Sequence, residues 1–303
     1  MLLQNRWPLR SRVHSLACLF AGWAFAGIIE CGSRTLIAAD EQELLVFIQA
    51  GELPIILSAP HGGTKVVPGV EARTGDAVPG GTGPFVVSRD VGTEELVTLI
   101  AAGLERRLGK KPYVVKSLAH RKFLDPNRPA AAAYEGDEAK VVYDAYHAAL
   151  VRFCREVQSK HRSGLLLDLH GQVLLPDAVL RGTNNGKTVA LLRERFGEAA
   201  HVGEASLFGR MRAAGIKVYP DPLDGPDHPR YNGGYIVQTY GSHQGFGIDA
   251  MQLEFGSDFR KPERRPATAD AVVEAIVRFC GDYLPSAPKP LTPQELAPVK
   301  SVK

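Results

Sequence analysis

Short apolar segments alternate with longer amphipathic segments along most of this chain, and this alternation is the feature that most restricts its fold. The strand predictions cover residues 54–60, 113–118, 164–169 and 248–255, and the helix predictions cover residues 92–108, 138–161, 187–196, 205–214 and 267–283. Strands that alternate with helices predict an α/β sheet covered by helices on both faces. Because ligands of such sheets bind where strands end, polar residues at strand ends are the candidates for function.

The first 39 residues have the layout of a secretory signal peptide. Arg6, Arg10 and Arg12 precede an uncharged apolar run at residues 17–29, which is short for a helix that crosses a bilayer, and small residues follow at 38–39. An amphipathic or buried first helix is the alternative. We therefore expect residues 1–39 to be a signal peptide or N-terminal anchor, and the protein to be secreted or periplasmic.

The remaining chain is electrically neutral. The whole sequence has a formal net charge of +3, but residues 1–39 hold four arginines and one glutamate, so 32 basic and 32 acidic residues remain. This balance excludes the dense basic face typical of nucleic-acid-binding proteins. We expect one catalytic domain at residues 40–284, a disordered proline-rich tail at 285–303, no nucleic-acid partner and no stable membrane span after processing. The sequence leaves open whether Cys154 and Cys280 pair.

Two histidines stand at the ends of predicted strands. His61 follows the first strand in the sequence PHGG, and His170 follows the most apolar strand, where Asp168 shares its face. A surface turn at His61 and a buried hydrogen-bonded pair of Asp168 and His170 are the alternatives. Two histidines with a carboxylate suit a catalytic Zn²⁺ that keeps one open position. Asp90, just before a predicted helix, is the first choice for the third ligand, and Glu94 is the second.

A carboxylate and a cationic loop complete the candidate site. Glu254 lies on a predicted strand whose other face is apolar, and burial raises the pKa of such a carboxylate towards neutrality, which suits a general base. The loop at 120–129 brings Arg121, Asn127 and Arg128 together, and the planar guanidinium of Arg128 suits a substrate carboxylate. A solvated charge cluster is the alternative for this loop.

The glycine-rich segment GTNNGKT at residues 182–188 is similar to a phosphate-binding loop. It has three residues between its glycines where that motif has four. We interpret it as a turn that precedes the predicted helix at 187–196, and we expect no nucleotide site there.

Five short motifs in this order resemble the N-formylglutamate amidohydrolase family, which is related in fold to zinc carboxypeptidases and succinylglutamate desuccinylases. They are PHGG, RDxGTxxL, RKFLDPNRP, DLHG and QLEF, and they span about residues 61–255. The resemblance implies a three-layer, phosphorylase/hydrolase-like α/β fold with a mixed central sheet. It also implies metal-dependent hydrolysis of an amide near a glutamate-like carboxylate.

The resemblance assigns roles to individual residues. His61 and His170 match the metal-binding histidines, and Asp90 matches an acidic position after the first motif. Asn127 and Arg128 resemble the pair that holds a substrate carboxylate in carboxypeptidase-like sites, and Glu254 corresponds to the base that activates water.

The sequence thus leads to the hypothesis of an exported zinc amidohydrolase. Its expected substrates are acylated glutamates, glutamate-containing peptides or cell-wall fragments, because an exported protein would not meet the cytoplasmic intermediate for which the family is named. A non-catalytic carboxylate- or peptide-binding protein that keeps the hydrolase fold is the alternative.

Overall fold

The computed structural model describes residues 45–76, 78–79 and 84–292. The expected signal segment at 1–39 and the last part of the expected tail, 293–303, lie outside these residues. Residues 285–292 contain no helix or strand, but the backbone N–H of Leu291 donates to the carbonyl of Arg107 over 2.8 Å. None of the helices in the described ranges is long and apolar enough to cross a membrane.

The described residues form one mixed sheet with the strand order β1-β3-β2-β4-β7-β5-β6. The strands are β1 Val46–Gln49, β2 Ile55–Ala59, β3 Tyr113–Ser117, β4 Leu165–Gln172, β5 Val179–Gly182, β6 Val218–Tyr219 and β7 Asp249–Gly256. The pairs β2–β3, β2–β4, β4–β7 and β5–β6 are parallel, whereas β1–β3 and β5–β7 are antiparallel. The α/β class and the mixed sheet are confirmed, and so are the four predicted strands. The short strands β1, β5 and β6 were not predicted.

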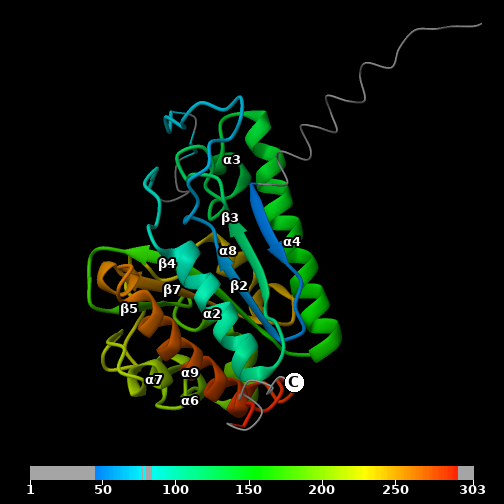
Figure 1. Ribbon diagram of the computed structural model, residues 1–303, viewed down its shortest axis with the longest axis vertical. Helices are drawn as coiled ribbons and strands as arrows, with labels where there is room; N and C mark the ends of the chain where they lie inside the picture. The colour runs from blue at the N-terminus through cyan, green and yellow to red at the C-terminus, as the bar shows by residue number, and fades with distance from the viewer. Residues whose placement is uncertain (1–44, 77, 80–83, 293–303) are drawn as a thin grey trace, which may run out of the picture.

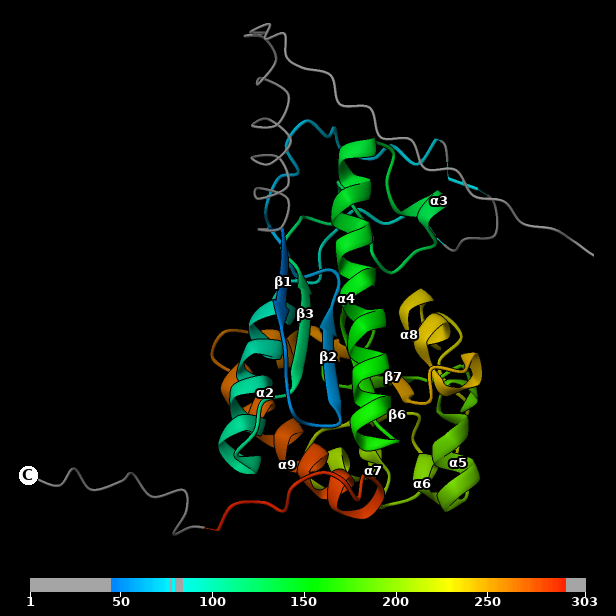
Figure 2. The same ribbon diagram turned by 90° about the vertical axis from the view of Figure 1, so that its right-hand side faces the viewer.

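The helices are α2 Thr93–Leu108, α3 Ala130–Ala133, α4 Asp137–His161, α5 Ala190–Phe196, α6 Ala199–Val202, α7 Leu207–Ala213, α8 Tyr235–Tyr240 and α9 Arg265–Tyr283, with 3₁₀ turns η1 Lys187–Val189, η2 Ser242–Gln244 and η3 Ser257–Arg260. Figure 1 shows α2 and α9 side by side on one face of the sheet, and Figure 2 shows the strands between α2 and α4. The three long helices agree with the prediction. Cys154 on α4 and Cys280 on α9 are both free, and they lie in apolar clusters on opposite faces of the sheet.

Alternate residues of the central strands point to opposite faces, which explains why helices cover both. Ile56 and Leu166 pack in a cluster with α4 and α8, whereas Leu57 and Leu167 pack in a cluster with α2, α7 and α9. All four side chains are fully buried. Strands that are apolar on both faces leave only their ends for polar chemistry.

The carboxyl ends of β2, β4 and β7 bring the predicted site residues to one edge of the sheet. His170 on β4 is in register with Glu254 on β7, and His61 lies two residues beyond the end of β2. The turn after His61 packs directly on the start of α2, because a Cβ at Gly62 would lie 2.7 Å from the backbone nitrogen of Glu94. This close approach requires glycine, and it brings His61 beside the segment that precedes α2.

Asp227 anchors the loop of residues 220–234, which leads into α8. Its Oδ1 accepts from Nε of Arg181 over 2.6 Å, and its Oδ2 accepts from the backbone N–H groups of Thr183 and Asn185 over 2.7 and 3.0 Å. The glycine-rich segment is therefore a turn, as predicted, and its backbone donors bind a carboxylate of the same chain. Asn184 and Asn185 provide the positive φ angles, 50° and 53°, that aim these donors.

Substitution of Arg181 by Met should lower the free energy of unfolding by about 3–5 kcal/mol, because it leaves Asp227 as a buried, uncompensated charge. Lys217→Met is the control, since its pair with Asp177 is about two-thirds exposed and removal should cost about 1 kcal/mol or less. Urea unfolding of both variants measures this difference. Equal losses would contradict the anchoring role.

Candidate functional site

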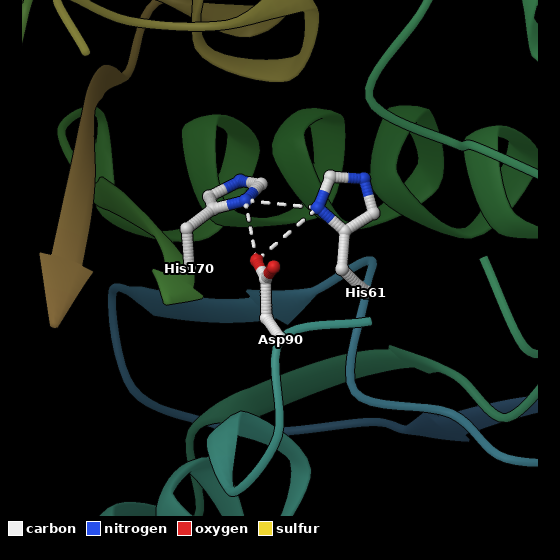
Figure 3. A group of neighbouring side chains, drawn as sticks. All are labelled: His61, Asp90 and His170. Carbon is white, nitrogen blue, oxygen red and sulfur yellow. Dashed lines mark hydrogen bonds and ion pairs between the residues drawn. The ribbon is translucent and has the colours of Figure 1, made fainter. Parts of the chain in front are cut away.

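His61, Asp90 and His170 converge at the sheet edge from three separate segments. His61 Nδ1 and His170 Nδ1 lie 3.3 and 3.4 Å from Asp90 Oδ2, and the two nitrogens lie 3.1 Å apart. Figure 3 shows the two imidazole rings and the carboxylate pointing toward one another. All three residues are buried and together could hold a metal ion. Glu94, the alternative third ligand, is not part of this group and pairs with Lys116 over 3.4 Å.

The outer nitrogens of both histidines contact further carboxylates. His61 Nε2 lies 2.6 Å from Asp125 Oδ1, and His170 Nε2 lies 2.7 Å from Asp168 Oδ2. A carboxylate accepts, so each Nε2 carries a proton, and Nδ1 is the ring nitrogen that can bind a cation once it has no proton of its own. These two nitrogens and the Asp90 carboxylate lie within 3.4 Å of one another and are three groups that can ligate a metal. This donor set fits a divalent cation.

The electrostatics of the cluster support the same conclusion. Burial by itself would raise the pKa of Asp90 and of Asp125, but hydrogen bonds and charge from the histidines, with Arg121 acting on Asp125, hold both well below their usual range. Burial would also lower the pKa of His170, yet the neighbouring Asp168 raises it well above its ordinary value. The Asp90 and Asp125 carboxylates are therefore ionised at neutral pH, and an ionised Asp90 can ligate a cation.

A buried hydrogen-bond chain extends behind His170. The Ser58 hydroxyl donates to Asp168 Oδ1 over 2.8 Å, and the Tyr146 hydroxyl lies 2.7 Å from Ser58 Oγ. Ser58 has one hydrogen and gives it to Asp168, so Tyr146 donates to Ser58. The chain fixes the Asp168 carboxylate, and through it the ring plane of His170, from α4, which covers the same face of the sheet.

Glu254 lies beside the cluster with one carboxylate oxygen in use and one free. Its Oε1 accepts from Nε2 of Gln252 over 2.7 Å, and its Oε2 has no hydrogen-bond partner among the described residues. Burial raises the pKa of Glu254 to about 7, with the charge of His170 lowering it and that of Asp90 raising it further. A carboxylate with a pKa near neutrality and a free oxygen can accept and return a proton.

The three predicted substrate-binding residues differ in whether their side chains are already bonded within the protein. Arg121 pairs with Asp125 through Nη2 and Nε, over 2.9 and 3.0 Å, so its charge serves the buried carboxylates. Asn127 Oδ1 accepts from the backbone N–H of Ile236 over 2.8 Å, which ties this loop to α8. Arg128 is half-buried and donates to the backbone carbonyls of Asn127 and Pro84. Among the described residues its guanidinium pairs with no carboxylate.

One cleft of about 730 Å³ contains the group of His61, Asp90 and His170, together with Glu254 and the three predicted substrate-binding residues. Its walls come from residues 84–90, the predicted loop at 120–129, the end of β4, and the far end of the anchored loop, residues 229–235. This volume falls within the usual range for small-molecule sites.

Arg260 joins the three segments that carry the central residues. Its Nε donates to the carbonyl of Phe255 and its Nη2 to that of Gln172, each over 3.0 Å, while its Nη1 donates to that of Val91. These carbonyls lie within two residues of Glu254, His170 and Asp90. A Cβ at Gly171 would lie 2.5 Å from the guanidinium carbon, so the glycine is needed for this packing.

Sequence reasoning gave no role to Asp125, Ser58, Tyr146 or Arg260. Asp125 had a usable signal, because it lies in the motif RKFLDPNRP and is the one acidic residue there. Arg260 had none, because the three carbonyls it binds come from distant parts of the chain.

No family model matches the chain, and no curated protein matches it. Solved structures do. N-formylglutamate amidohydrolase from Ralstonia eutropha is 15% identical, with a TM-score of 0.49 and coverage of 78% of this chain and 97% of that chain. A gene product of Agrobacterium tumefaciens is 12% identical, with a TM-score of 0.51 and coverage of 80% and 97%. A bacteriophage poly-gamma-glutamate hydrolase is 14% identical, with a TM-score of 0.37 and coverage of 78% and 89%. The similarity to the Agrobacterium protein supports the fold, and the matches include the family that the motifs resemble.

Arg260→Lys should weaken metal binding about 10- to 100-fold, because an ammonium group cannot donate to all three carbonyls in one plane. Gly171→Ala should have a similar effect, since its methyl group displaces the same guanidinium. Competition with a chelator measures the metal affinity, and circular dichroism checks folding. Wild-type affinity in both folded variants would contradict this role.

His147 on α4 should make stability depend on pH below neutrality. Its Nε2 donates to the Pro126 carbonyl over 3.0 Å, its Nδ1 accepts from the Tyr240 hydroxyl over 2.7 Å, and burial lowers its pKa to about 4. An unfolded histidine titrates near about 6.5, so this stability is present above that pH and is lost as the pH falls towards about 4. Between pH 7 and 4.5, the unfolding free energy should fall by about 2 kcal/mol more in the wild type than in His147→Gln. Urea titrations in which the unfolding free energy of both proteins changes equally with pH would refute this.

Proposed function

We propose that this protein is an exported zinc-dependent amidohydrolase that cleaves an amide bond in an N-acyl amino acid or glutamate-containing peptide with a free carboxylate. The observation that carries the proposal is the convergence of three acceptor groups, from His61, Asp90 and His170, beside the half-free carboxylate of Glu254. Three ligands and a nearby base of pKa about 7 form the arrangement expected of a hydrolytic metal site.

His61, Asp90 and His170 would hold the ion. Two imidazole nitrogens and one carboxylate are a ligand set that zinc takes in catalytic sites, where the remaining position stays open. When bound, zinc would supply a Lewis acid for the amide carbonyl and would lower the pKa of water. Asp125 and Asp168 keep both histidines in the tautomer that offers Nδ1.

The side chains of the cleft account for proton transfer and orientation. The free Oε2 of Glu254 takes a proton from the attacking water and returns it to the leaving nitrogen, so that amide and water become a carboxylic acid and an amine. Arg128 on the cleft wall offers a guanidinium to the substrate carboxylate and thereby aligns the amide.

The export part of the proposal is supported by the sequence of residues 1–39 alone. Basic residues, a short apolar run and small residues follow one another there, as in secretory signal peptides. The net charge of zero beyond this segment agrees with a small-molecule or peptide substrate rather than a nucleic acid.

Purified protein that lacks residues 1–39 should retain about one zinc ion per chain by mass spectrometry. His61→Ala and His170→Ala should each lose it, while His243→Ala on η2, outside the cleft, should keep it. Zinc that both cleft variants retain at the wild-type level would defeat the proposed metal site.

Glu254→Gln should keep its zinc and lose at least about 100-fold in the rate of amide hydrolysis, because the amide side chain cannot accept the proton. A panel of N-acyl amino acids and glutamyl peptides provides the assay. Binding of these compounds by the wild type without any turnover would instead indicate a non-catalytic binding protein.

A further inference from the structure

Exposed apolar side chains lie on the two segments that carry Asp90 and His170 into the cleft. Among the described residues, Val173 is 74% exposed and lines the cleft, Val91 is 55% exposed and Leu174 is 46% exposed. Phe85 and Val87, on the segment that leads to Val91, are also exposed. Large apolar side chains that gather beside a polar cleft are typical of a ligand-binding surface. We call Val91, Val173 and Leu174 the apolar lip.

The residues of the lip come from two segments that are bonded to one another. The guanidinium of Arg260 donates to the carbonyls of both Val91 and Gln172, and the backbone N–H of Gly171 donates to Asp90 Oδ2 over 3.0 Å. These bonds fasten the segment before α2 to the end of β4. Val91 and Val173 therefore belong to two segments that the Arg260 side chain holds together.

Val173 and Arg128 line the same cleft as the ring of His170. Nδ1 of that ring faces Asp90, the neighbour of Val91 in the chain, at 3.4 Å. Its Nε2 faces Nδ2 of Asn127, the neighbour of Arg128, at 3.3 Å. A ligand that binds both Arg128 and Val173 therefore lies in the cleft that also contains His170, Asp90 and Glu254.

Residues 84–91 form a wall along this whole path. The carbonyl of Pro84 accepts from Nη2 of Arg128 over 3.0 Å at one end, and the carbonyl of Val91 accepts from Arg260 at the other. The segment turns mostly apolar side chains, Phe85, Val87 and Val91, to the outside. A ligand along this wall meets Arg128 at the Pro84 end and the lip at the Val91 end, with Arg89 between them.

We propose that the substrates are N-acyl amino acids with a straight apolar acyl chain, whose carboxylate binds Arg128 and whose chain lies on the apolar lip. This inference rests on the proposed function, because it puts the scissile amide at the cluster between these two ends. A formyl or acetyl group has almost no apolar surface to bury there. The carbonyls of Val91 and Gln172 already accept from Arg260, so the lip offers an acyl chain apolar contact and gives a peptide backbone few free acceptors.

The test compares N-octanoyl-glutamate with N-acetyl-glutamate as ligands of the zinc-loaded protein. Calorimetry with Glu254→Gln gives both Kd values without turnover, and kcat/KM of the wild type gives the rates. Half-burial of each added methylene is worth about twofold, so the octanoyl compound should bind roughly 50-fold more tightly. N-acetyl-leucyl-glutamate serves as the peptide alternative and should gain much less.

The double substitution Val173→Ser and Leu174→Ser should reduce this chain-length gain about fivefold or more, because it removes apolar surface from the lip. Val141→Ser is the matched control, since Val141 is 48% exposed on α4 and does not line the cleft. In Val141→Ser, the gain in affinity from acetyl- to octanoyl-glutamate should equal the gain in the protein with an unchanged lip.

Each outcome bears on one of the two proposals. Equal Kd values for octanoyl- and acetyl-glutamate, or equal effects of the lip and control substitutions, would overturn the inference about the lip. Hydrolysis without chain-length preference would leave the amidohydrolase proposal intact and reject the lip. Binding that strengthens with chain length, without hydrolysis of any ligand, would support the lip and reject the amidohydrolase.

Discussion

The guanidinium of Arg260 holds the functional edge of the sheet together, because it binds main-chain carbonyls of three separate segments. Phe255, Gln172 and Val91 supply these carbonyls at the ends of β7 and β4 and before α2. Each lies next to a segment that carries a candidate functional residue. The side chain is buried, and the missing side chain of Gly171 makes room for it. The positions of Glu254, His170 and Asp90 therefore depend on one planar group with several donors, which lysine cannot replace.

Within that frame, buried charges are arranged so that each carboxylate faces a histidine or an arginine. Asp125 lies between His61 and Arg121, and Asp168 lies between His170 and Ser58. Burial of so many ionisable groups is costly unless they are paired, which explains why the predicted substrate residue Arg121 is used internally. Glu254 is the exception, with an oxygen that has no partner in the described structure and a pKa of about 7. A buried carboxylate oxygen without a partner in a cleft makes Glu254 the candidate for proton transfer.

The same principle explains the segment that is similar to a phosphate-binding loop. Its backbone donors do bind an anion, but the anion is Asp227 of the same chain. Arg181 completes the pair, and the loop that follows forms a wall of the cleft. The sequence pattern correctly indicated a turn. It contained no information on a partner more than 40 residues away.

Sequence alone determined the layers of the fold and the residues at the sheet edge. Apolar runs such as 164–169 require burial on both faces, and polar residues that follow them must lie where parallel strands end, which puts His61, His170 and Glu254 together. Only the tertiary structure decided what these residues contact. The bond between His61 and Asp125 joins residues 64 positions apart, and Arg260 gathers three distant segments. Local patterns report burial and periodicity, whereas hydrogen-bond partners depend on strand register and loop path, which the packing of the whole chain sets.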